Sequence, residues 1–178
     1  MNATKFSIEI NEMHWLFKED INADLCAHGN VKVIIGDELI AGIKEDEDWT
    51  ISATALFLLR TLERNHTKEN QVGEHLIPCC GHFLVFTEDT KEVYVGGCPS
   101  GIDWEVIHEN GCVKLRTESG KETLINFDFY KSEVLKFVDK VEHFYIESGE
   151  KTIPEDEFER NGYLEFWKEW KIKRSKWV

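Results

Sequence analysis

The stretch WEVIHENGCVKLRT constrains the fold of this chain more than any other. Asn110 and Gly111 separate two runs in which apolar and charged residues alternate. An Asn-Gly pair favours a two-residue type I′ hairpin, because both turn positions need positive φ. This turn places Val106 opposite Leu115, so the apolar side chains share one face of the hairpin and the charged ones share the other. We therefore predict an antiparallel pair with one buried face.

Shorter alternating or β-branched runs predict further strands at KFSIEI, VKVII, HFLVFT, VYVGGC and ETLINF. We expect HFLVFT and VYVGGC to pair through a three-residue loop from Asp89 to Lys91, which places His82 opposite Cys98.

Three segments have helical spacing instead. The first follows Asp48 or Thr50 as the N-cap and carries its apolar residues on one side, with Thr54 and Thr61 elsewhere. The second follows Asp128 and ends at Gly149. The third is expected to begin at Thr152, where TIPE resembles a capping box, and Asn161-Gly162 is a candidate break in it.

This order of elements predicts an α+β fold. We expect an antiparallel meander sheet of about five to seven strands, one helix inserted after the N-terminal strands, and two C-terminal helices packed on the sheet. With 178 residues, of which 42% are hydrophobic, the chain can bury one core, so residues 1 to 178 are predicted to form a single globular domain.

Composition narrows the classes of function. The formal net charge of −13 argues against nucleic acid as a partner, because phosphate contacts need clustered Lys and Arg. No run of 18 apolar residues and no signal-peptide pattern occurs, which argues against a membrane span and secretion. The five cysteines form a poor disulfide framework, so we expect a reducing cytoplasm.

The run GDELIAGIKEDEDW concentrates acidic side chains at Asp37, Glu38, Glu45, Asp46 and Glu47. It lacks the alternating ligands and central glycine of an EF-hand, so a calcium loop is not expected. Two interpretations stay open: a solvated loop whose last acids stabilise the next helix, or a docking surface for a basic protein.

Cysteine and histidine gather in HLIPCCGHF and GCPSG. His75, Cys80, His82 and Cys98 are chemically suited to zinc, although their spacing matches no strong zinc signature. Burial in the core is the alternative, because free cysteine packs as a small hydrophobe. A nucleophilic thiol at Cys98 or Cys80, with His82 or His108 as its base, is a third interpretation.

No nucleophile elbow, P-loop, dinucleotide fingerprint or HExxH occurs, so no motif supports catalysis. The leading hypothesis is a small acidic cytoplasmic protein that needs no cofactor and binds another, basic protein. Size and acidity are compatible with a bacterial immunity or antitoxin protein, which is an analogy and not a motif match. The alternative is a metal-dependent or thiol-dependent site, with zinc as its cofactor, around His82 and Cys98. The sequence leaves the oligomeric state open.

Overall fold

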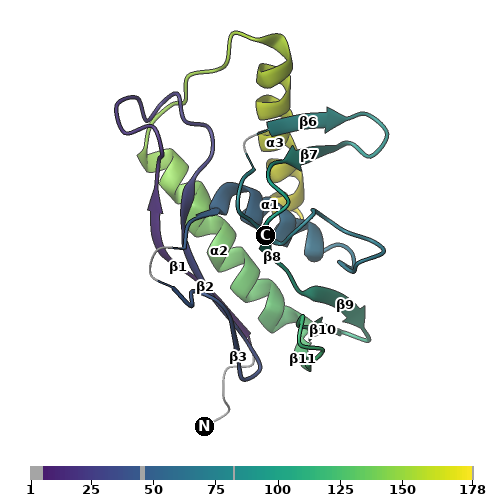
Figure 1. Cartoon of the computed structure of the whole chain (residues 1–178). Helices are drawn as coiled ribbons and strands as arrows, with labels where there is room; N and C mark the ends of the chain where they lie inside the picture. The colour runs from purple at the N-terminus through teal and green to yellow at the C-terminus, as the bar shows by residue number, and fades with distance from the viewer. Residues whose placement is uncertain (1–5, 45–46, 82, 178) are drawn as a thin grey trace.

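The structure is a computed structural model that describes residues 6–44, 47–81 and 83–177 (Figure 1). The helices are α1 (Ile51–Thr61), α2 (Phe127–Glu147) and α3 (Glu157–Ser175). The strands are β1 (Phe6–His14), β2 (His28–Ile35), β3 (Glu38–Ala41), β4 (Trp49–Thr50), β5 (Ile77–Pro78), β6 (Phe83–Thr87), β7 (Glu92–Gly96), β8 (Gly101–Ile102), β9 (Glu105–Glu109), β10 (Cys112–Arg116) and β11 (Glu122–Asn126). The predicted α+β class is confirmed, with one helix after the N-terminal strands and two at the C-terminal end.

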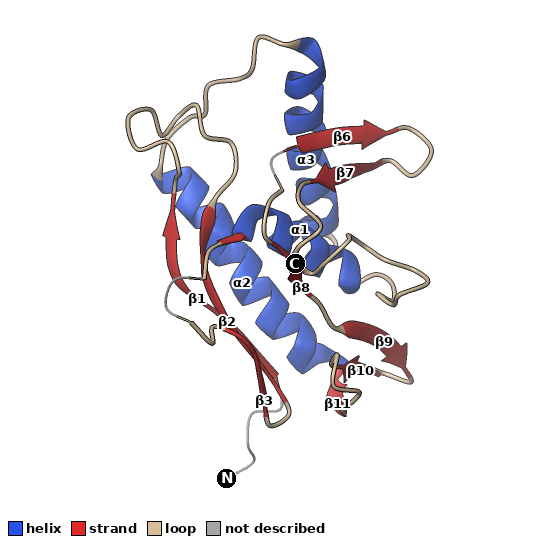
Figure 2. Ribbon diagram, viewed as in Figure 1, coloured by secondary structure: helices blue, strands red, loops and turns tan. Residues whose placement is uncertain are grey.

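The strands divide among several antiparallel sheets and do not form one continuous meander. β1, β2 and β3 lie in order, with β4 paired to β2, and β9, β10 and β11 form a second sheet. β6 pairs with β7, and β5 pairs with β8. Figure 2 shows α2 crossing the β1–β2 layer, while the β6–β7 hairpin lies against α3 and α1 contacts both long helices.

The hairpin at Asn110-Gly111 forms as predicted. Asn110 has φ of 47° and Gly111 has φ of 77°, as a type I′ turn requires. Val106 lies opposite Leu115, and both side chains are fully buried. The alternating pattern therefore sets the register of this sheet.

The register predicted for the β6–β7 hairpin is wrong by one residue. Leu84 pairs with Val95, and residues 88 to 91 form a four-residue loop. The loop closes with Lys91 at φ of 58°, and the Lys91 N–H donates to the Thr87 carbonyl at 2.9 Å. The ladder therefore does not hold the expected pairing of position 82 with Cys98, and His82 itself lies outside the described residues.

Helix α1 is buried on every side, which corrects the expectation of a one-sided helix. Its hydroxyls are accommodated by hydrogen bonds within the core. Thr54 donates to the Thr50 carbonyl at 3.1 Å, and Thr61 donates to the Leu58 carbonyl at 2.6 Å and also bonds the Tyr130 hydroxyl. A polar residue in α1 thus does not mark an exposed face, because its hydrogen bonds are satisfied locally.

Helix α3 begins five residues later than TIPE predicted. The Asp156 carboxylate accepts the N–H groups of Phe158 and Glu159, both at 3.0 Å, and so caps the helix. The N–H of Thr152 instead donates to the Asn22 carbonyl at 2.9 Å. The helix is not broken at Gly162, where a Cβ would lie 2.1 Å from the Leu84 carbonyl oxygen. Glycine is needed there because β6 approaches the helix backbone.

A buried ion pair joins α1 to α3. Arg60 Nε donates to Glu169 at 2.7 Å, and its terminal nitrogens donate to the carbonyls of Val72 at 2.6 Å and Val93 at 2.7 Å. Glu169 also accepts the Val93 N–H at 2.8 Å. Burial opposes ionisation of the neighbouring Glu92, but its hydrogen bond from Arg64 and the surrounding cations outweigh burial and lower its pKa to about 2. The pair thus fixes the position of β7 between two helices.

Replacing Glu169 by Gln should destabilise the protein by roughly 3 kcal/mol, because it removes the hydrogen-bonded carboxylate of the buried Arg60 and leaves only Glu92, at 3.8 Å, to balance that charge. The matched control is Glu165→Gln, which removes a more exposed pair with Lys168 on the same helix and should change stability by under about 1 kcal/mol. Urea denaturation measures both free energies of unfolding. Equal effects from the two variants would contradict a structural role for the buried pair.

Candidate functional site

Two chain segments bring three cysteines together. Cys79 and Cys80 directly follow β5, and Cys98 follows β7. The Cys79 N–H donates to the Ser100 carbonyl at 2.9 Å and extends the short β5–β8 ladder. A Cβ at Gly97 would lie 2.5 Å from the Cys80 carbonyl oxygen, so glycine lets the segment after β7 lie directly against Cys80.

The three thiols form one compact cluster. Their Sγ atoms all lie within 4.8 Å of one another, with 3.2 Å between Cys80 and Cys98 and 3.8 Å between Cys80 and Cys79. All three side chains are half-buried, and none forms a disulfide. Within the described ranges this is the one group of three or more His, Cys, Asp or Glu side chains arranged closely enough to hold a metal ion.

Hydrogen bonds within the cluster favour a thiolate at Cys98. The Cys80 thiol, the Ser100 backbone N–H and the Cys79 thiol, in that order, lower the pKa of Cys98. The hydrogen bond to Cys98, followed by burial, raises the pKa of Cys79 to about 12. Cys26 lies outside the cluster, and burial raises its pKa to about 12. The cluster is therefore where thiolate chemistry is favoured in this chain.

The structure brings together two of the four residues predicted to bind metal, Cys80 and Cys98. Cys79 was missed, although its position beside Cys80 after Pro78 was a signal that both could reach one site. His75 packs against Gly101 and is not part of the cluster. His82 lies outside the described residues.

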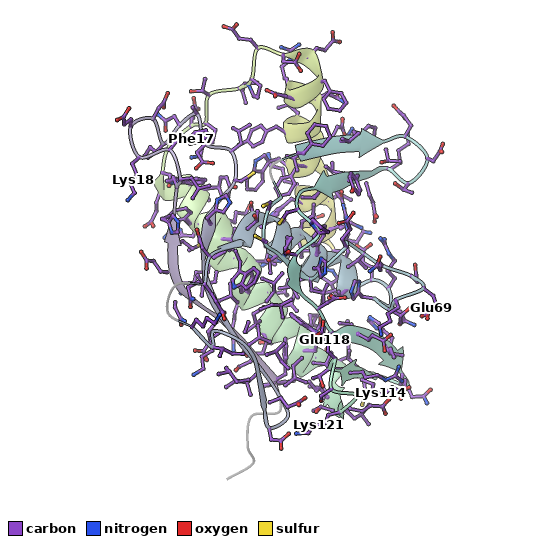
Figure 3. The ribbon with its side chains drawn as sticks, in the orientation of Figure 1. Phe17, Lys18, Glu69, Lys114, Glu118 and Lys121 are labelled. Carbon is purple, nitrogen blue, oxygen red and sulfur yellow. The ribbon has the colours of Figure 1, made fainter. Side chains whose placement is uncertain are left out.

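The described members of the acidic run have partners within the chain. Glu38 accepts hydrogen bonds from the hydroxyls of Thr117 at 2.6 Å and Ser119 at 2.8 Å, and these bonds lower its pKa. Lys121 donates to Asp37 at 3.1 Å and lowers the pKa of that carboxyl. Figure 3 shows Lys121 beside the tip of the β2–β3 hairpin. These acids tie two hairpins together.

Glu47 is also used internally, because its carboxylate accepts the N–H of Gly42 at 2.9 Å and of Lys44 at 3.3 Å. Glu45 and Asp46 lie outside the described residues. The acidic run therefore has a structural role at each described position, and a docking role for it stays a prediction.

An apolar pocket of about 390 Å³ lies on another part of the surface. We call it the Phe17 pocket, and its lining is Leu16, Phe17, Ala23, Asp24, Leu25, Cys26, His28, Phe83, Leu84, Phe158, Glu159 and Tyr163. Its large rim side chains are unusually exposed, at 57% for Phe17, 51% for Phe83 and 50% for Phe158. Figure 3 shows Phe17 and Lys18 on the loop after β1.

A buried histidine beside an aspartate is better explained by structure than by catalysis. The Val72 N–H donates to His66 Nδ1 at 3.0 Å, so the proton of the neutral ring lies on Nε2, which donates to Asp103 at 2.9 Å. Asp103 also accepts the Leu76 N–H at 3.0 Å. His66 is fully buried and both of its nitrogens are occupied, so it is not available to a substrate.

Comparison with known proteins identifies no relative: no family model, curated protein or solved structure matches this chain. Among the residues that the structure describes, no helix is both long and apolar enough to cross a membrane.

Replacing Glu38 by Gln should lower stability near neutral pH and have little effect in acid. The folded-state pKa of Glu38 is lowered, so its stabilisation is present above the ordinary Glu value of about 4.3 and is lost as pH falls through the folded-state value. Urea midpoints at about pH 7 and about pH 3 measure the difference. The control is Glu118→Gln, which changes an exposed acid between Thr117 and Ser119, the two residues that bond Glu38. An equal loss of stability in the two variants would contradict the assignment.

Proposed function

We propose that the protein binds a soft metal ion, with Zn²⁺ as the reference ion, through Cys79, Cys80 and Cys98. The observation that carries this proposal is the mutual approach of three Sγ atoms within 4.8 Å. A Zn–S distance of about 2.3 Å and tetrahedral angles separate two zinc-bound sulfurs by about 3.8 Å. The Cys79 and Cys80 sulfurs already lie 3.8 Å apart, and those of Cys80 and Cys98 need to separate only slightly from 3.2 Å.

The donor set also limits the kind of ion. Thiolates are soft ligands that favour zinc or monovalent copper over magnesium or calcium. Three protein ligands leave one tetrahedral position for water or another donor, which is the pattern of zinc sites that remain open. The five free thiols are consistent with a reducing compartment, so we place the protein in the cytoplasm as part of this proposal.

The reduced protein should bind one zinc ion per chain. Zinc titration in competition with a chromophoric chelator, followed by elemental analysis after desalting, measures affinity and stoichiometry. We expect Cys80→Ser and Cys98→Ser each to weaken binding by at least about tenfold, because each removes one of three thiolates. Gly97→Ala keeps every ligand but should also weaken binding, because its Cβ would displace Cys80.

The matched control is Cys112→Ser, because Cys112 is a half-buried cysteine outside the cluster. This variant should bind zinc as tightly as the original chain. Replacing zinc by Co²⁺ provides a second readout, because thiolate ligation gives charge-transfer absorption that Cys98→Ser should reduce. Absence of stoichiometric zinc, or an equal loss of affinity in Cys112→Ser, would overturn the proposal.

As a second candidate function, we propose that the chain binds a basic protein through the Phe17 pocket. The specific observation is an apolar pocket with exposed aromatic side chains, bordered by segments that contain more acidic than basic residues. The segments 16–24 and 155–160 that border it contain Glu19, Asp20, Asp24, Glu155, Asp156, Glu157 and Glu159 against Lys18 and Arg160. Lys151 also reaches this border, where it donates to the Ile21 carbonyl at 2.6 Å. A fitting occupant is a partner segment that inserts one bulky apolar side chain and carries Lys or Arg on either side.

This pocket gives the hypothesis of a basic partner a more suitable surface than the acidic run, because it combines exposed aromatic side chains with exposed carboxylates at Glu19 and Glu159. The net charge of −13 would speed encounter with such a partner, and the apolar pocket would hold it. An immunity-like or antitoxin-like role is one form that this function could take.

Two synthetic peptides test the second candidate. Both have one central leucine, which is flanked by lysines in the first peptide and by glutamates in the second. Fluorescence anisotropy should show the lysine peptide binding at least about tenfold more tightly, with a gap that narrows as salt rises. Phe17→Ser should weaken its binding. Phe129→Ser, which changes a 40% exposed aromatic residue outside the pocket, is the control. Equal binding of both peptides, or equal losses in both variants, would contradict this candidate.

A further inference from the structure

Two thiols of the cluster lie close enough together to form a disulfide after a small movement. The Sγ atoms of Cys80 and Cys98 lie 3.2 Å apart, whereas a disulfide bond is about 2.05 Å long. Closure therefore requires an approach of only about 1.2 Å. The two residues lie on separate segments that Gly97 allows to touch, so side-chain rotation and a small backbone shift can supply this movement.

The competing pairings are less favourable. Cys79 and Cys80 are adjacent, and consecutive Cα atoms lie about 3.8 Å apart, below the 4.4–6.8 Å usual for disulfides. Cys26 is 5% exposed, and its thiol donates to the Gly81 carbonyl at 3.5 Å. Cys112 lies on β10 and is not part of the cluster. Cys79 and Cys98 are the remaining competitor, because their sulfurs lie within 4.8 Å of each other, whereas those of Cys80 and Cys98 lie 3.2 Å apart. The sulfur positions thus favour the pair of Cys80 and Cys98 among the five cysteines.

We infer that Cys80 and Cys98 form a reversible disulfide when a small disulfide such as oxidised glutathione is present, and that this bond prevents metal binding at the cluster. The first half of the inference rests on sulfur positions alone. The second half rests on the proposed metal-binding function.

The chemistry is a two-step thiol–disulfide exchange. A thiolate of the pair attacks one sulfur of oxidised glutathione, forms a mixed disulfide and releases one glutathione thiolate. The other cysteine, after losing its proton, attacks the protein sulfur of that mixed disulfide and releases the second glutathione. Two protein thiols are oxidised to one disulfide, one oxidised glutathione is reduced to two thiols, and the two protons pass to the released glutathiones.

The oxidised protein retains one free thiol in the cluster, at Cys79. A single thiolate cannot provide the three sulfur ligands that the proposed site uses. Metal binding and the disulfide are therefore mutually exclusive. Bound metal should slow oxidation of the pair, and the disulfide should prevent metal binding.

The experiment equilibrates the metal-free, full-length protein with mixtures of reduced and oxidised glutathione. Free thiols are then alkylated, and intact mass and peptide mapping identify the linked residues. We expect two of the five thiols to disappear, with a loss of two hydrogens and a crosslink between the peptides that contain Cys80 and Cys98. Cys80→Ser and Cys98→Ser should each abolish this product, and the control Cys112→Ser should retain it.

Zinc at about ten times its Kd should slow this oxidation about tenfold, because only the metal-free fraction reacts. A different crosslink or an intermolecular crosslink would overturn the inference. So would five free thiols after equilibration with oxidised glutathione alone. The two proposals fail separately. A Cys80–Cys98 crosslink without zinc binding would refute the metal site alone, whereas zinc binding without the crosslink would refute the disulfide alone.

Discussion

The buried pair of Arg60 and Glu169 is the interaction on which the arrangement of this chain depends. It joins the central helix α1 to α3, and both members also bond to the backbone of Val93. A buried ion pair is tolerable only when its remaining hydrogen-bonding groups are satisfied, and here backbone carbonyls of two other segments satisfy Arg60. The position of β7, and of Cys98 two residues beyond its end, follows from this network.

The thiol cluster then arises from close backbone approach more than from any long element. β5 and β8 are only two residues each, yet their pairing fixes the position of Cys79, which directly follows β5. Gly97 has no side chain to separate the end of β7 from Cys80. Gly81 packs just as tightly, since its Cβ would lie 3.1 Å from side-chain atoms of Thr50, Ala53 and Val95. Such a site depends on glycine positions as much as on its ligands.

Local chemistry made part of this structure predictable from sequence. Asn110-Gly111 carries its own turn preference, so the hairpin, its register and its buried face could all be predicted. The predicted start of α3 failed because Thr152 is bonded to the distant Asn22, while Asp156 caps the helix. The sequence also could not show the structural role of Glu38 in the acidic run, because its hydroxyl partners lie about 80 residues away.

The candidate site was only half predictable for the same reason. Strand register was expected to bring His82 opposite Cys98, whereas Cys80 and Cys98 meet outside the paired strands, where loop packing decides the contact. The predicted register of the β6–β7 hairpin was wrong by one residue, and such an error reverses the face that each side chain occupies. The predicted register therefore could not show that Cys79 lies beside Cys80 and Cys98. Alternation carries no information about loops that glycines allow to pack closely.

The Phe17 pocket and the thiol cluster are connected through shared residues, and this limits which variants can affect one proposed site without the other. Cys26 and His28 line the Phe17 pocket, while the Cys26 thiol bonds the Gly81 carbonyl. The Thr50 hydroxyl donates to the Cys79 carbonyl at 3.2 Å and lies 3.4 Å from His28 Nε2. A change at any of these positions would disturb both the pocket and the thiol segment. Phe17, on the rim of the pocket, and Cys98, in the loop after β7, each contribute to one site alone. Variants at such positions therefore separate peptide binding from thiol chemistry.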